Sequence, residues 1–292
     1  MRDTDGTDTL AGEQEPVKDG VAEQPVYRFA ACIEYDGSSY HGWQSLKSGL
    51  PTVQAAVESA IGRVANHPIS VVCAGRTDAG VHGSHQIIHF DTTSVRDLRG
   101  WVYGTNTHLP DAIAMRWVKP VSEAFHARFS ALARRYRYVI YNNSIRPAHL
   151  SKGVTWNYRP LDVERMREAG QYLVGTHDFN SYRAVQCQAK SPVRTIEHLE
   201  LNRYGDLIVM DVKANAFLHH MIRNIAGVLM AIGTGKREPI WAKEVLDARD
   251  RKAGGVTAAP WGLYFVDVLY PDEFELPREP LGPSFVTALM DS

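Results

Sequence analysis

Hydrophobic positions in the first part of the chain alternate with polar ones in some stretches and recur every three or four residues in others. Alternation is typical of half-buried strands, and the longer period is typical of amphipathic helices. Thr52 stands where it can cap a helix, and Ser94 with Asp97 resembles a capping box. In order, the pattern predicts a strand at 27–35, a helix at 53–65, strands at 69–73 and 86–90, a helix through 98–102 and a strand at 112–118.

The second part of the chain repeats this order of elements. Asp162 is placed to cap a helix that ends at Gly175, and Asn215 to cap one that ends at Gly233. A hairpin turn is predicted at 204–206. The predicted elements are a strand at 136–141, a helix from 162, paired strands at 195–202 and 207–212, a helix from 215, a short inserted helix at 241–248 and a final strand at 263–269.

This repeated order predicts an α+β protein made of two tandem split β-α-β units of the ferredoxin-like or RRM-like kind. Each unit implies an antiparallel sheet with its helices packed on one face, and the active-site cleft is expected between the halves because such a site can draw on both. We expect an N-terminal domain at 25–126 and a C-terminal domain at 127–275. Residues 1–24 are predicted to be a disordered acidic extension, and 276–292 a C-terminal tail.

The formal net charge of −1 conceals an uneven distribution along the chain. Residues 1–24 hold seven acidic and two basic residues, and residues 271–292 hold five acidic and one basic. The remaining residues, 25–270, hold 21 acidic and 29 basic residues, a net charge of +8. A basic body between acidic ends fits a polyanionic partner, although this charge alone does not identify RNA.

The three cysteines, Cys32, Cys73 and Cys187, are odd in number, far apart and without a Cys-x-x-Cys pair. This pattern favours reduced thiols in the cytoplasm over a disulfide framework or a zinc knuckle. No apolar run approaches the length of a membrane span, and the polar, acidic N-terminus is unlike a signal peptide. We therefore expect a cytoplasmic protein that does not associate with membranes.

The segment 74–83, Ala-Gly-Arg-Thr-Asp-Ala-Gly-Val-His-Gly, carries the candidate chemistry of the chain. It lies between two predicted strands, and its three glycines surround Arg76 and Asp78. A glycine-lined loop at a strand end is where an exposed, positioned carboxylate is expected. On residue types alone, a simple turn in which Asp78 bonds its own backbone is the alternative.

The amino-acid sequence of residues 76–82 closely resembles the signature loop of the tRNA pseudouridine synthases of the TruA family. Further segments resemble that family in the same order and at similar spacing, namely 33–37, 42–44, 125–130, 134–138, 213–217, 219–221, 223–224 and 262–264. The resemblance runs from about residue 26 to about residue 271. It implies an isomerase that converts uridine to pseudouridine at positions 38, 39 and 40 of the tRNA anticodon stem-loop and that works as a homodimer.

The resemblance also assigns site residues. It places the catalytic carboxylate at Asp78, the active-site basic residue at Arg223 and the active-site aromatic residue at Tyr136. Among the other residues, Leu263 is expected to pack beside the base, with an ordinary core leucine as the alternative. Arg76, two residues from Asp78, is a candidate for holding the flipped nucleotide or ordering the loop. A desolvated carboxylate needs an opposite charge to stay ionised, which is the role expected of Arg223.

The implied reaction breaks the N1–C1′ bond and joins C5 to C1′ without a redox change, so we expect no cofactor. A carboxylate near C1′ can stabilise positive charge, add covalently as a nucleophile, or act as a base at C2′, and the sequence leaves these routes open. The uridine must leave its stack to reach the loop. Arg134 and Arg135, next to Tyr136, are the predicted phosphate contacts, and a charged strand edge exposed to solvent is the alternative.

Three other classes of protein compete with this interpretation. The twelve histidines raise the possibility of a metal site, with His82, His85 and His89 in one group and His219 and His220 in another. No His-Glu-x-x-His helix is present, and we expect no catalytic metal. A non-enzymatic RNA-binding module would bind through sheet aromatics and would not need the Asp78 loop, so a turnover assay separates it from an isomerase. An aspartic protease would need a second loop to form its carboxylate dyad.

Overall fold

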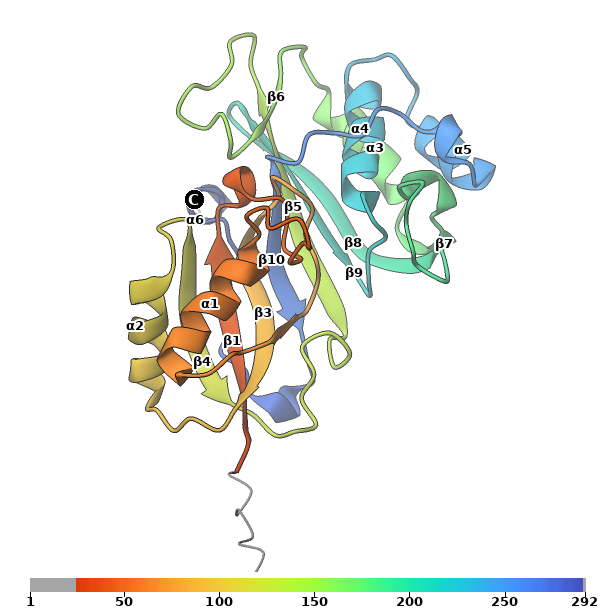
Figure 1. Ribbon diagram of the computed structural model, residues 1–292. Coiled ribbons are helices and arrows are strands. Elements are labelled where there is room, and N and C mark those ends of the chain that lie inside the picture. Colours follow the sequence, from red (N-terminus) through yellow and green to blue (C-terminus); the bar gives the residue numbers. More distant parts are fainter. Residues whose placement is uncertain (1–24, 291–292) are drawn as a thin grey trace, which may run out of the picture.

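One continuous sheet of ten strands forms the centre of the molecule, which we describe from a computed structural model over residues 25–290 (Figure 1). The strand order is β4-β1-β3-β10-β5-β9-β8-β7, with β2 paired to β3 and β6 paired to β5. Most neighbouring strands are antiparallel, and helices pack against the sheet, which confirms the predicted α+β class. The predicted extension at 1–24 lies outside the described residues.

The elements of the two halves follow the predicted order. The N-terminal half contains β1 (Tyr27–Tyr35), α1 (Val53–Ala65), β2 (Val71–Cys73), β3 (His82–Thr92), α2 (Leu98–His108) and β4 (Ile113–Pro120). The C-terminal half contains β5 (Ala133–Asn142), β6 (Thr155–Asn157), α3 (Val163–Gln171), β7 (Gly175–Asp178), β8 (Val193–Tyr204), β9 (Leu207–Ala214), α4 (Met221–Gly233), α5 (Trp241–Ala248) and β10 (Leu263–Leu269).

Both halves arrange their four main strands in the same spatial order. In the N-terminal half this order is β4-β1-β3-β2, and in the C-terminal half it is β10-β5-β9-β8. The two expected sheets are joined because β2 has only three residues and pairs with β3 at Ile88–Phe90. The start of β3 is therefore free to pair in parallel with β10, with Tyr264 opposite His82 and Phe265 opposite Gly83.

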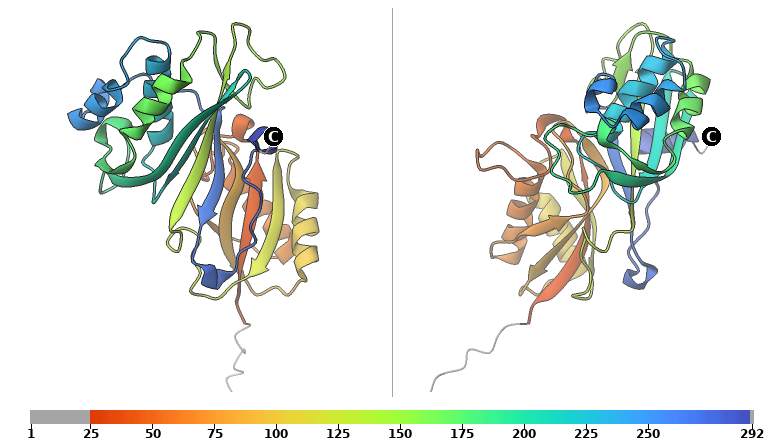
Figure 2. Two further views of the ribbon diagram at one scale, coloured as in Figure 1. Left: turned by 180° about the vertical axis from the view of Figure 1, so that it is seen from behind. Right: turned by 90° about the vertical axis from the view of Figure 1, so that its right-hand side faces the viewer.

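Helices cover each half separately (Figures 1 and 2). In the N-terminal half, Ile61 of α1 and Trp101 of α2 are fully buried in a core that includes Phe29 and Phe90. The rings of Phe29 and Phe90 stack at 5.6 Å. In the C-terminal half, α3, α4 and α5 enclose a second core against β5, β8, β9 and β10. Burial of these apolar faces is the main term that stabilises the fold.

The predicted helix starts are right at two places and wrong at two. Thr52 caps α1, and Asp162 caps α3 by accepting a hydrogen bond from the Arg165 amide at 3.1 Å. Asp97, not Ser94, caps α2, because the Ser94 hydroxyl donates to a backbone carbonyl of α1 instead. The helix predicted from Asn215 begins only at Met221. The Asn215 side chain instead accepts hydrogen bonds from the amides of residues 195 and 216.

The C-terminal segment packs against the sheet on the face opposite α4. It ends in α6 (Ser284–Met290), where Val286 is fully buried against Val139 and Val266. The Arg137 guanidinium donates hydrogen bonds to the carbonyls of Leu281 and Gly282, both at 2.9 Å. Figure 2 (left) shows this segment running along the back of the sheet. The acidic tail expected from the sequence is thus part of the folded body over its described residues.

Two further structural facts bear on the expectations from the sequence. The thiols of all three cysteines are free, and Cys32 is buried. Among the helices of residues 25–290, none combines the length and apolar character needed to cross a membrane.

Candidate active site

The loop between β2 and β3 is held in place by contacts that do not involve the Asp78 side chain. The Trp43 amide donates a hydrogen bond to the Thr77 carbonyl at 3.0 Å, and the hydroxyls of Tyr35 and Thr77 lie 2.9 Å apart. Gly80 has φ +78°, and an added Cβ would lie 3.0 Å from the ring of Pro260, so glycine is needed on both counts. The loop is therefore shaped by its surroundings and presents Asp78 independently of that side chain.

The partners of the Asp78 carboxylate within the described residues come from the other half of the molecule. Arg223, in the first turn of α4, places Nη1 3.3 Å from Asp78 Oδ2. Its Nε donates to the carbonyl of Ala258 at 2.8 Å, which fixes the guanidinium plane. The Arg223 side chain is 15% exposed and that of Asp78 is 24% exposed. An arginine held in this way favours the ionised form of the carboxylate.

His219 and His220, considered from the sequence only as possible metal ligands, also face Asp78. His219 Nε2 lies 3.2 Å from Oδ1, and His220 Nε2 lies 3.3 Å from Oδ2. Adjacent side chains can reach one carboxylate here because His220 adopts a left-handed conformation, with φ 61° and ψ 5°, just before α4. Burial lowers the pKa of His220, and the neighbouring Asp78 carboxylate opposes that shift. The sequence signal was their position within one helical turn of Arg223.

The ligand atoms of Asp78, His219 and His220 lie within 4.8 Å of one another, a spacing compatible with a metal ion. Arg223 occupies the same oxygen, Oδ2, as His220. A fixed guanidinium next to a divalent cation is electrostatically unfavourable. The cluster is therefore better described as a carboxylate that pairs with one permanent cation, Arg223, and is contacted by two histidines.

Aromatic and apolar side chains line the strands beside this cluster. Tyr136 of β5 stacks on Phe265 of β10 with ring centroids 4.6 Å apart and meets the edge of Phe217 at 5.1 Å. Burial raises the pKa of Tyr136 far above its ordinary value, so its hydroxyl stays protonated. Leu263 is buried in the same core, on the strand that joins the halves. The structure thus brings Tyr136 and Leu263 to the junction where Asp78 lies.

The three arginines predicted to contact substrate lie in different environments. Arg76 is an exposed residue of the Asp78 loop. Arg134 donates hydrogen bonds to four backbone carbonyls, of residues 74, 128, 131 and 215, so it ties the loop to its neighbours. Arg135 is not brought to the site. It forms two hydrogen bonds with Asp211, at 2.6 and 3.0 Å, on the face of β5 opposite Tyr136, because successive side chains of a strand alternate.

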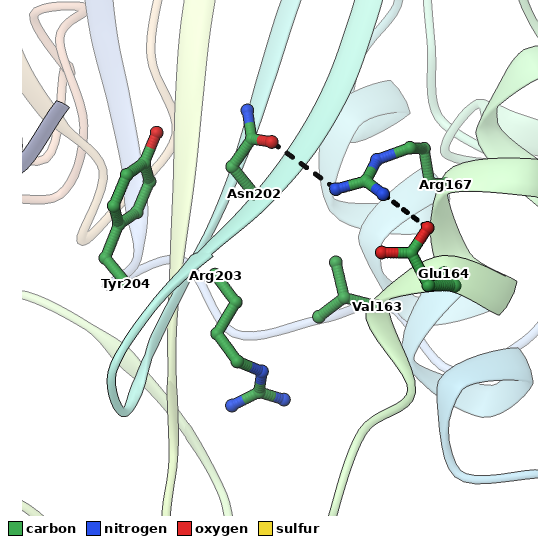
Figure 3. Close-up of a pocket in the computed structure, with 6 residues that line it drawn as sticks. All are labelled: Val163, Glu164, Arg167, Asn202, Arg203 and Tyr204. Atoms are coloured by element: carbon green, nitrogen blue, oxygen red, sulfur yellow. Dashed lines mark hydrogen bonds and ion pairs between the residues drawn. The ribbon is translucent and has the colours of Figure 1, made fainter.

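A surface pocket lies elsewhere, between α3 and β8 (Figure 3). Its lining includes Glu164, Arg167 and Asn202, and none of the predicted site residues. Arg167 forms an ion pair with Glu164 and a hydrogen bond with Asn202. Arg203, the other charged residue of the lining, donates hydrogen bonds to the Asn142 side chain and the Leu161 carbonyl. With these groups already bonded, the hollow offers no comparable chemistry, and the junction at Asp78 is the better candidate site.

Comparison with known proteins identifies the class to which this fold and site belong. A family model described as "tRNA pseudouridine synthase" matches residues 31–130 and 169–271. The chain belongs to this family, which makes it an isomerase of the pseudouridine synthase class that acts on tRNA.

The matched relatives are also similar over nearly their whole length. A protein named tRNA pseudouridine synthase A from Pseudomonas aeruginosa is 62% identical over 91% of this chain and 93% of its own. Proteins of the same name from Alcanivorax borkumensis and Aliivibrio salmonicida are each 58% identical, over 88% and 89% of this chain and 96% and 98% of their own. The resemblance to the TruA family seen in the motifs is confirmed.

Proposed function

We propose that this protein converts uridine to pseudouridine in the tRNA anticodon stem-loop, at positions 38, 39 and 40, with Asp78 as the catalytic carboxylate. The observation that carries the proposal is the convergence of Arg223, His219 and His220 on Asp78 from the other half of the chain. A structural turn residue would need no such set of partners. A nucleophile or base at the ribose has to stay ionised and oriented in a site shielded from water, which a fixed counter-charge and neighbouring polar groups provide.

The chemistry of the step follows from the atoms that move. The N1–C1′ bond breaks, the detached uracil turns, C5 bonds to C1′, the proton on C5 is lost and N1 gains one, so atoms and electrons balance without a cofactor. Asp78 acts at the ribose, either as the nucleophile at C1′ or as the base at C2′. Arg223 holds the carboxylate ionised and oriented. Tyr136 and Leu263 form the apolar side of the pocket for the flipped base.

The target uridine must leave its stack to reach the loop, so the tRNA backbone has to be gripped beside Asp78. Arg76 is exposed in the loop itself, which suits a contact to the flipped nucleotide. Nearby, the exposed ring of Phe129 stacks on His126 at 4.3 Å and lies under Arg128 at 5.5 Å. Such a mixed basic and aromatic surface can bind phosphate and stack on bases. We further propose that the protein acts in the cytoplasm as a homodimer.

The test compares Asp78→Asn with Asp162→Asn under single-turnover conditions, using tRNA tritiated at uracil C5. Asn keeps the shape of Asp and removes its charge, so Asp78→Asn should abolish tritium release, a loss of at least about 10³-fold, while tRNA affinity stays within about threefold. Asp162→Asn is the control because asparagine caps a helix as well as aspartate does, and it should release tritium normally.

The site of modification is read in the same experiment by mapping pseudouridine in the product. Modification at 38–40 with the wild type and none with Asp78→Asn supports the proposal. Near-normal tritium release by Asp78→Asn, with deamidation excluded by mass spectrometry, would show that Asp78 is structural. Tight binding of tRNA without any release by the wild type would favour the RNA-binding module instead.

A further inference from the structure

A second cluster of metal-ligating side chains lies on the back of the sheet, away from the Asp78 site. Cys32 of β1, His85 of β3 and Glu279 of the C-terminal segment direct one ligand atom each to a common point, within 4.8 Å of one another. Cys32 and His85 are buried, and the Glu279 side chain is 24% exposed. We propose that these three residues form a zinc site that clips the C-terminal segment to the sheet.

Cys32 Sγ lies within hydrogen-bond reach of both other groups, whereas His85 and Glu279 are too far apart to hydrogen-bond each other. Cys32 Sγ lies 3.4 Å from His85 Nδ1 and 3.9 Å from Glu279 Oε2, and the last two atoms are 3.6 Å apart. A nitrogen and an oxygen at 3.6 Å do not form a hydrogen bond. Three polar groups thus converge on the back of the sheet with the Cys32 sulfur as their shared partner.

The same distances fit a tetrahedral zinc ion. Zinc binds thiolate sulfur at about 2.3 Å and imidazole nitrogen or carboxylate oxygen at about 2.0–2.2 Å, which places tetrahedral ligand atoms roughly 3.4–3.6 Å apart. Each distance observed in the cluster lies within about 0.3 Å of this range. The set of one sulfur, one nitrogen and one oxygen is also one that zinc accepts and magnesium or calcium does not favour. A water molecule would complete the fourth position.

Neighbouring groups support the ligands from outside. Arg116 Nε lies 3.5 Å from Glu279 Oε1, the carboxylate oxygen that does not face the cluster, and so orients Oε2 toward it. The carboxylate of Asp267 in β10 is close enough to His85 to interact with it electrostatically. Carboxylates behind a ligating histidine are a common outer shell of zinc sites. With a thiolate and a carboxylate, the bound ion would be neutralised before Arg116 is counted.

The location gives the zinc a structural role. Cys32 and His85 lie on paired strands of the N-terminal half, and Glu279 lies just ahead of the stretch whose carbonyls bond Arg137 in the C-terminal half. A metal that joins them fixes the C-terminal segment across both halves. His85 is also only seven residues beyond Asp78 in the chain, so the clip would steady the strand that follows the Asp78 loop without touching the chemistry.

The experiment uses the full chain, stripped with a chelator and titrated with zinc ions alone against a chromophoric competitor. One equivalent should bind and raise the melting temperature, and cobalt in its place should show a thiolate charge-transfer band. Cys32→Ser and Glu279→Gln should each weaken binding at least about tenfold. Cys73→Ser, Cys187→Ser and Asp78→Asn should bind as the wild type does, the last because the Asp78 cluster is separate.

Glu279→Gln is included because its partly exposed side chain can lose a charge without disturbing the core, so a loss of zinc binding in this variant is not explained by misfolding. No zinc binding by the wild type would overturn the proposal. Binding that survives both Cys32→Ser and Glu279→Gln, or that is lost in Asp78→Asn, would also overturn it and would place the ion elsewhere. Zinc-dependent melting with unchanged tritium release would support a structural clip.

Discussion

The two halves share one topology but contribute opposite charges to the site. In the N-terminal half, residues 74–81 separate the second and third strands and carry Asp78. At the equivalent place in the C-terminal half, the two strands are joined by a tight turn, with Tyr204 paired to Leu207. A repeated fold can therefore keep its core in both copies while one connection grows into a functional loop.

The second helices of the two halves, α2 and α4, also differ in how their N-terminal ends are capped. Helix α2 begins with its own acidic cap, Asp97, whose carboxylate accepts a hydrogen bond from the Gly100 amide. Helix α4 has no side-chain cap, and the carboxylate near its start is Asp78 of the other half. The positive end of a helix favours a negative charge. The first turn of α4 therefore faces an acid supplied by the other half, whereas α2 carries its own.

The two halves contribute opposite charges to the site, and the largest effect that tests this is expected at Arg223. Arg223→Ala removes the permanent counter-charge and should slow single-turnover tritium release by about 10²-fold or more, with tRNA affinity changed less than about threefold. Arg223→Lys should recover part of the rate. Arg165→Ala, which removes an arginine of the C-terminal half paired with Glu238, serves as the control. Equal losses in rate and affinity for Arg223→Ala would mean that Arg223 grips the tRNA.

A smaller effect is expected at His220. Its pKa is lowered by burial, so it is neutral near pH 7 and becomes charged only as the pH falls below its ordinary value of about 6.5. Protonation adds a second cation to Asp78 Oδ2 and should slow the reaction, giving an acid limb in the rate. His220→Gln should lower the rate at pH 7 by about tenfold and should flatten that limb. An unchanged pH profile would show that the contact is only structural.

Substitution of an arginine outside the Asp78 cluster should affect either tRNA binding or stability, depending on where that arginine lies. Arg76→Ala, in the loop, should weaken tRNA binding and reduce the slope of log affinity against log salt by about one. Arg135→Ala should leave that slope unchanged and instead lower stability by about 1–2 kcal/mol, because it deprives the buried Asp211 of a partner. Binding titrations at several salt concentrations check the slope, and chemical denaturation checks the stability. A flattened slope for Arg135→Ala would place tRNA on the back of the sheet.

The last effect leaves the reaction untouched and concerns the acid stability of the N-terminal half. Burial lowers the pKa of His89 to about 4, and its Nδ1 accepts a hydrogen bond from the Ala127 amide at 3.0 Å. The unfolded chain binds this proton more readily, so stability should fall as the pH drops from about 6.5 to about 4, by about 2 kcal/mol. His89→Gln should flatten this dependence, whereas His108→Gln, at an exposed position, should not. Denaturant unfolding measured at several pH values provides the check.

Local patterns in the sequence determined most of the elements and the central motif. The helix Val53–Ala65 and the strand Leu263–Leu269 were predicted with the bounds observed. The pattern of apolar residues that defines each element lies entirely within those bounds. The Asp78 loop was identified by its glycines and by its resemblance to a known family. Both kinds of signal are confined to neighbouring residues, which is why one chain was enough to find them.

The tertiary structure decided where distant groups meet. His219 and His220 are close to Arg223 in sequence, but it is the late start of α4 and the left-handed backbone of His220 that turn them toward Asp78, and no local pattern predicted either feature. Arg134 and Arg135 are adjacent in sequence, yet strand pleating sends them to opposite faces, and only the pairing of β5 decides which face meets the loop. The joining of the two sheets at β3 and β10, and the burial of the C-terminal segment behind them, likewise depend on contacts between residues far apart in the chain.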